Sequence, residues 1–180
     1  MAKTYTAVPS VNTGDVYTAQ SYNTYTAANV SNLIVPPAAK IWRTSNLTGY
    51  TTGAQITYQA VSYDTDSMWS SGTPTVLTIQ TAGIYVVTFS VNWSATATVT
   101  AWQPAININN GASNVARLEL ACPSTTQGWA VVTYTGSLGV STVLGSSVSF
   151  TGGSAYSLNG SGSDVASNTI LTATWIGRTS

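Results

Sequence analysis

The sequence is poor in charge and contains no histidine. Its 180 residues include five lysines and arginines and five aspartates and glutamates, so 6% of the side chains are charged and the net charge is zero. Ordinary soluble domains carry about a quarter charged residues. Phosphate binding needs clustered basic side chains, and the five here are scattered, which indicates no nucleic-acid partner.

Cysteine occurs once, at Cys122, and long apolar runs are missing. A single cysteine excludes an intramolecular disulfide, and without histidine it also excludes a zinc site, which takes several nitrogen or sulfur ligands. No apolar stretch approaches the roughly 20 residues needed to cross a bilayer, and the N-terminus lacks the apolar core of a secretory signal. We therefore expect no membrane partner, synthesis in a cytoplasm, and a buried, inert thiol at Cys122.

Few residues remain that could carry catalysis. The whole supply of carboxylate side chains is Asp15, Asp64, Asp66, Glu119 and Asp164. Asp64 and Asp66 are weak candidates for binding a cation such as calcium, which takes about six to eight oxygen ligands. A turn stabilised by aspartate side chains is the favoured interpretation. The sequence thus predicts no catalytic residue, no cofactor and no metal.

The place of the charges is taken by threonine, serine, asparagine, glycine and alanine, and the β-branched threonine and valine favour extended backbone. Strands separated by turn residues are predicted over residues 40–43, 55–63, 75–79, 84–93, 98–102, 105–109, 116–121, 129–138, 147–151 and 169–176. The apolar run 84–93 is expected at the centre of a two-layer core, and the surface loop 152–168 is expected to hold a short edge strand near 156–158. The pattern predicts an all-β sandwich, jelly roll or barrel with one core.

A helix is predicted before the strands, over about residues 19–33. Four residues share one helical face: Tyr22, Tyr25, Asn29 and Leu33. Thr18 can cap this helix with its hydroxyl, and Pro36-Pro37 ends it. Residues 1–37 are therefore predicted as an N-terminal arm and residues 38–180 as one β domain. A short helix of weak formers needs a surface to pack on, either on its own domain or on another protein.

Six tryptophans and ten tyrosines are available to stack on sugar rings, but most are expected in the core because aromatic side chains bury large areas. Trp69, beside a turn, and Tyr156, in the late loop, are predicted to be the aromatic residues least tied to a core. These two are the candidate ligand contacts, with a host surface glycan as the ligand.

From Pro37 to its C-terminus the sequence resembles the jelly-roll heads of the complement-type globular and tumour necrosis factor superfamily, particularly their phage counterparts. The likeness lies in Gly83-Ile84-Tyr85 at the start of an apolar strand and in the apolar final run 170–176. The resemblance implies an antiparallel jelly-roll sandwich that forms a homotrimer.

The segment 13–25 is similar to an N-terminal segment of tailed-phage proteins, in which an aromatic residue, an asparagine and a tyrosine match Tyr22, Asn23 and Tyr25. This similarity implies a structural protein of a phage virion, made in the cytoplasm of the bacterial host and displayed on the particle. A trimeric capsid decoration protein is the leading hypothesis because no heptad coil or collagen-like shaft extends the chain.

The arm is then expected to contact the major capsid protein or another virion protein through Tyr22, Tyr25 and Leu33. Two alternatives stay open. One is the receptor-binding head of a tail fibre or tail tip, which would recognise a host surface glycan. The other is a glycan-active enzyme, which the shortage of carboxylates disfavours.

Overall fold

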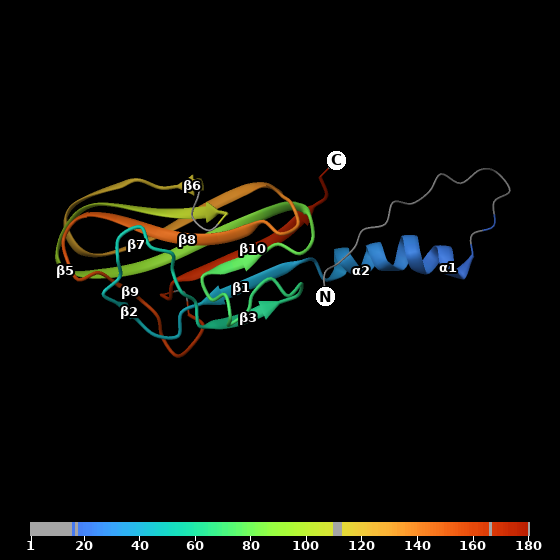
Figure 1. Cartoon of the computed structure of the whole chain (residues 1–180), viewed down its shortest axis with the longest axis horizontal. Coiled ribbons are helices and arrows are strands. Elements are labelled where there is room, and N and C mark those ends of the chain that lie inside the picture. Colours follow the sequence, from blue (N-terminus) through green and yellow to red (C-terminus); the bar gives the residue numbers. More distant parts are fainter. Residues whose placement is uncertain (1–15, 17, 110–112, 166, 180) are drawn as a thin grey trace.

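The strands of the chain form a layered antiparallel structure from which a helix projects (Figure 1). The computed structural model describes residue 16 and residues 18–109, 113–165 and 167–179, without the side chains of residues 24, 25, 28, 31, 32 and 122–125. The strands within these residues are β1 (Ala38–Trp42), β2 (Leu47–Thr48), β3 (Ala60–Asp64), β4 (Val76–Thr78), β5 (Gly83–Ile108), β6 (Ser113–Arg117), β7 (Leu120–Leu138), β8 (Val143–Gly152), β9 (Ser157–Leu158) and β10 (Ile170–Gly177). The predicted antiparallel sandwich is confirmed.

Hydrogen bonding joins these strands into one sheet that folds over on itself. The first layer has the order β3-β1-β10-β5-β7, and every neighbouring pair is antiparallel. The second layer is built on the later half of β5, which pairs with β8, with β6 and with the start of β7, while β4 pairs with β8. The β5–β7 ladder shifts register between Ser94 and Val99, where β5 passes from one layer to the other.

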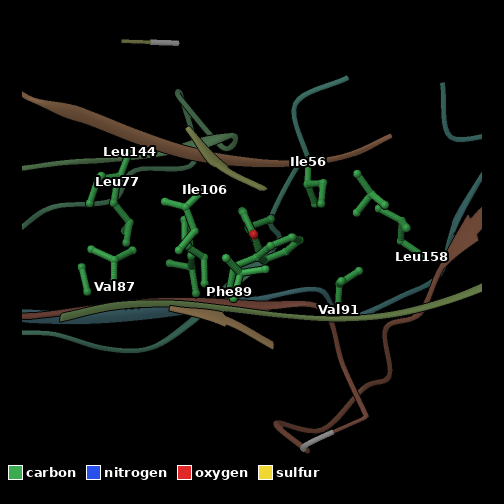
Figure 2. Close-up of a cluster of buried hydrophobic side chains, with 14 of the residues drawn as sticks. Ile56, Leu77, Val87, Phe89, Val91, Ile106, Leu144 and Leu158 are labelled. Atoms are coloured by element: carbon green, nitrogen blue, oxygen red, sulfur yellow. The ribbon is translucent and has the colours of Figure 1, made fainter. Parts of the chain in front are cut away.

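The hydrophobic core lies between the two layers (Figure 2). Alternate residues of β5 are fully buried, including Val87, Phe89 and Val91. They face buried side chains of the second layer, among them Ile106 and Leu144. A period of two in burial is what a strand with one face on a core requires, and it sends the other half of the β5 residues to the outside.

Several of the strand boundaries differ from those predicted. Residues 84–93, 98–102 and 105–109 form the single strand β5, with Pro104 inside it. The turns expected between these segments are absent, because the ladders to β7 and β8 keep the backbone extended. The predicted strand 116–121 is divided between β6 and β7, and the edge strand expected near 156–158 is present as β9.

Within the predicted strand 55–63, only the part from Ala60 onward belongs to a strand, β3. Before it, the Ile56 amide donates to the carbonyl of Ser146 at 3.0 Å and the Tyr58 amide donates to that of Pro74 at 2.8 Å. These partners lie in different segments, so no ladder forms. Both side chains are nevertheless buried.

The predicted helix is present and is continuous from Ala19 to Ile34. It consists of α1 (Ala19–Ser21), a π-helical stretch η1 (Tyr22–Ala27) and α2 (Ala28–Ile34). Thr18 caps it as predicted, because its Oγ1 accepts a hydrogen bond from the Ser21 amide at 3.1 Å. Figure 1 shows the helix pointing away from the strands, so it does not lie on its own β domain.

The link between this helix and the strands is held by hydrogen bonds. Thr65 Oγ1 donates to the carbonyl oxygen of Pro36 at 2.6 Å and accepts from the Ala38 amide at 2.8 Å. The Trp175 amide, on β10, donates to the carbonyl oxygen of Pro37 at 2.8 Å. The helix therefore leaves the β domain at a defined place beside β10.

Candidate interaction surfaces

The outward side of the first layer is a broad exposed sheet face, called the outer face below. Its central residues alternate with the buried ones and are Ile84, Val86, Thr88, Ser90 and Asn92 of β5, Thr172, Thr174 and Ile176 of β10, and Trp129, Val131, Thr133 and Thr135 of β7. The register places Thr172, Thr88 and Thr133 in one row across the three strands. Hydroxyl and apolar groups, rather than charged groups, thus make up this surface.

Lys40 extends that row on β1, opposite Thr172, and its charge is neutralised. Lys40 Nζ lies 2.8 Å from Asp164 Oδ1, and Ser62 Oγ donates to the other carboxylate oxygen. The hydrogen bond from Lys40, and after it the one from Ser62, holds the pKa of Asp164 below its usual range. A surface pair of this kind contributes little to stability, but it leaves this edge of the outer face without net charge.

Large apolar side chains are exposed on the outer face. Trp129 is 58% exposed, Ile176 is 55% exposed and Val131 is 39% exposed. In the ladder between β5 and β7, Trp129 lies opposite Asn92 and Val131 lies opposite Ser90. Ile176 lies beside Ile84, at the other end of this part of β5. Trp129 and Val131 therefore form one exposed apolar patch on a rigid sheet face, which is typical of a surface that binds something.

The two aromatic residues predicted as ligand contacts are tied to the core. Trp69 and Tyr156 are partly buried and pack against the core cluster. Tyr156 also stacks on Phe150, with ring centroids 4.2 Å apart and planes inclined by 10°, and its hydroxyl donates to the carbonyl of Gly152. The expectation that these two are the aromatic residues least tied to the core is wrong, and a ligand contact at either stays a prediction.

Sequence reasoning missed Trp129, which is far more exposed than the buried tryptophans at 42, 93, 102 and 175. The sequence did contain a pattern that separates Trp129 from the core residues of its strand. In the predicted strand 129–138, Trp129 alternates with Ala130 and Val132, so it falls on the face opposite to theirs. Only the structure shows that Ala130 and Val132 point into the core.

Asp64 organises a turn instead of presenting its carboxylate to a ligand. Its Oδ1 accepts hydrogen bonds from the amides of Asp66 at 3.2 Å and Met68 at 2.9 Å, and its Oδ2 accepts from the Trp69 amide at 2.9 Å. The favoured interpretation of this pair, a turn stabilised by aspartate, is confirmed for Asp64. In the part of the chain that the structure describes, no group of three histidine, cysteine, aspartate or glutamate residues could hold a metal ion.

Several buried polar groups near β8 hold the loop of residues 43–59 in place. Tyr58 Oη lies 2.5 Å from Ser146 Oγ, and Tyr50 Oη accepts from the Val148 amide at 3.0 Å. Burial raises the pKa of Tyr50 to about 12 and also raises the pKa of Tyr58 above its usual range. Arg43 is buried as well, donates to two backbone carbonyl groups, and has its pKa lowered by desolvation.

The helix presents apolar side chains to solvent. Tyr22 is 53% exposed, Leu33 is 66% exposed and Ile34 is 73% exposed. The side chain of Tyr25, the third predicted anchoring residue, lies outside the described residues, as does that of Cys122. No helix in the described ranges is long and apolar enough to span a bilayer.

This strand arrangement is a jelly roll of the complement C1q and tumour necrosis factor type. The globular domain of a zebrafish complement 1qA protein matches with a TM-score of 0.52 and 12% identity, over 79% of this chain and 99% of that one. The Eiger TNF of S. frugiperda gives 0.55 and 11%, over 80% and 94%. Murine APRIL at pH 5.0 gives 0.56 and 10%, over 78% and 98%.

Identities this low establish the fold alone. The jelly-roll resemblance inferred from the sequence is therefore confirmed at the level of fold. Neither the protein-family models nor the curated protein sequences give a match.

Proposed function

We propose that this protein is a non-enzymatic structural component of a bacterial virus, displayed on the particle as a homotrimer that decorates the capsid. The observation that carries the self-association is the outer face, with its threonines, exposed apolar side chains and neutralised lysine. Burying this face between copies removes apolar area from water and desolvates no unpaired charge. The viral assignment is supported by the similarity of segment 13–25 to the N-terminal segment of tailed-phage proteins.

The N-terminal arm is proposed to fasten the trimer to the major capsid protein or another virion protein. Tyr22, Tyr25 and Leu33 are the residues assigned to this contact. The exposure of Leu33, at 66%, and of Tyr22, at 53%, supports the assignment, because apolar groups on a projecting helix lose water contact only by binding elsewhere.

Light scattering on the full chain at micromolar concentration tests the self-association. We expect the mass of three chains, and a monomeric mass would contradict the proposal. The viral role is tested by mass spectrometry of purified virus particles, which should contain the protein. Replacing Tyr22, Tyr25 and Leu33 together by alanine should remove it from the particles, and particles that keep normal occupancy would contradict the anchoring role.

A second candidate function is a receptor-binding head that recognises a host surface glycan, and the observation that favours it is Trp129. An exposed indole on a rigid strand can stack on the apolar face of a sugar ring, and the amide of Asn92, opposite it, can hydrogen-bond sugar hydroxyls. Binding of neutral polysaccharide that is lost in Trp129→Ala without a change in mass would favour this function. Loss of the trimer in the same variant would favour the interface.

A further inference from the structure

The projecting helix carries two adjacent rows of side chains. Residues four apart lie on the same side of a helix. The first row is Tyr22, Thr26, Val30 and Ile34, and the second row includes Asn29 and Leu33. In the first row the large apolar members are exposed, with Tyr22 at 53%, Val30 at 45% and Ile34 at 73%. An exposed apolar row of this length on a helix needs a surface that covers it.

Apart from the Thr18 cap, the helix lacks the usual local sources of stability. It has no acidic residue in its first turn and no basic residue in its last, so its macrodipole is not compensated by side chains. The segment 16–39 contains no charged residue, and ion pairs between neighbouring turns are therefore absent as well. Serine, threonine and asparagine are weak helix formers, and the helix Ala19–Ile34 is only just longer than about 12–15 residues, the length below which even alanine-rich helices are marginal alone. Packing must supply the missing stability.

We infer that the part of the first row next to the β domain, Val30 and Ile34, packs against the same residues of the two other copies, so that the trimer is closed at one end by a bundle of three helices. Tyr22, at the far end of the helix, is left for the anchoring contact. This inference rests on the proposed self-association through the outer face. The helix leaves the β domain where the carbonyl oxygen of Pro37 accepts a hydrogen bond from the Trp175 amide. Trp175 lies on β10, which is one of the strands of the outer face. Copies related by a threefold axis at the outer face bring their helices together on the same side, pointing the same way.

The absence of charge favours the identical helices of the other two copies as the surface that covers this part of the first row. Packing three copies of segment 16–39 together opposes no like charges and buries no ionised group. The second row then flanks the contact between the helices, which places Leu33 at the rim of the bundle three times per trimer. Three linked copies of one weak contact bind a particle far more tightly than a single copy does, which suits the proposed anchoring role.

Adjacent aspartate substitutions in the full chain test the two rows separately. Val30→Asp should lower the helical circular-dichroism signal and raise the concentration at which the trimer dissociates by about tenfold or more, because an unpaired carboxylate would be buried in each copy. Leu33→Asp is the matched variant, because it adds the same charge to the second row instead of the first. It should weaken the trimer and lower the helical signal less than Val30→Asp does, while it reduces incorporation into virus particles.

Disulfide trapping gives an independent measurement in a Cys122→Ala background. Under mild oxidation, Ile34→Cys should form covalent dimers rapidly, whereas Leu33→Cys should form few. If the unmutated chain is trimeric but Ile34→Cys gives no cross-link and Val30→Asp behaves as the parent, the bundle is refuted and the outer-face interface stands. If Val30→Asp stays trimeric but is not incorporated, the first row binds another virion protein and the inference is also overturned. A monomeric unmutated chain would overturn the proposed self-association itself.

Discussion

Truncation of Trp129 offers a quantitative test of the outer face as the surface between copies. Covering a tryptophan side chain removes up to about 250 Å² from water, so the 58% of Trp129 that is exposed corresponds to about 145 Å². At about 25 cal/mol per Å², burial in an interface contributes up to about 3.6 kcal/mol per copy. The alanine side chain retains a small part of this burial free energy. We therefore expect Trp129→Ala to cost about 3 kcal/mol per copy, which corresponds to a roughly 150-fold weaker interface.

Sedimentation equilibrium from sub-micromolar to high-micromolar concentration measures this change directly. The melting temperature of the dissociated chain should hardly move, because the indole points away from the core. Val140→Ala is the matched control, since Val140 is 59% exposed but lies in the turn between β7 and β8. Unchanged dissociation in Trp129→Ala, or an equal change in both variants, would refute the assignment of this face.

Three further predictions concern stability. Gly160→Ala should lower the melting temperature by roughly 2–12 °C, an overpacking cost of about 1–3 kcal/mol, because a Cβ there would lie 2.4 and 2.8 Å from two backbone carbonyl oxygens. Gly162→Ala, with nothing within 4 Å, should not change it, and equal calorimetric transitions for both would contradict this reasoning. Asp64→Ala removes the acceptor of three backbone amides and should cost about 2 kcal/mol in urea unfolding, more than Asp64→Asn, which keeps one oxygen. Because the pKa of Tyr50 rises from an unfolded value near 10 to about 12 and that of Tyr58 is also raised, the stability present below about pH 10 should fall as the pH rises from about 10 to 12. Tyr50→Phe should make this fall shallower, and an unchanged slope would show that Tyr50 does not contribute.

The parts of the fold that were predictable from sequence depend on local patterns. The apolar run 84–93 indicated a core strand, which contains the buried Phe89 and Val91, and the hydroxyl of Thr18 marked the start of the helix. Strand boundaries were less predictable where long-range pairing decided them. Pro104 lies inside β5 because β8 and β6 pair with β5 there, and no local signal reports such partners.

The candidate site was predictable only in its chemistry. The scarcity of charge already implied an uncharged exposed surface, and the spacing of Tyr22 and Leu33 implied an apolar helix face. The choice of Trp69 and Tyr156 as the aromatic residues least tied to a core failed because both lie in irregular segments that pack against the core. A position in a loop does not report whether the loop packs.

The sequence by itself determined the low charge, the all-β class, the capped helix and which residues share a strand face, because composition, capping and a period of two are properties of neighbouring residues. Only the tertiary structure decided which of the two strand faces lies on the core. Alternation makes Trp129 and Ala130 opposite to each other, but it does not say which of them is inside. That choice follows from the pairing of strands far apart in the chain, which covers one face of β7 and leaves Trp129 on the other.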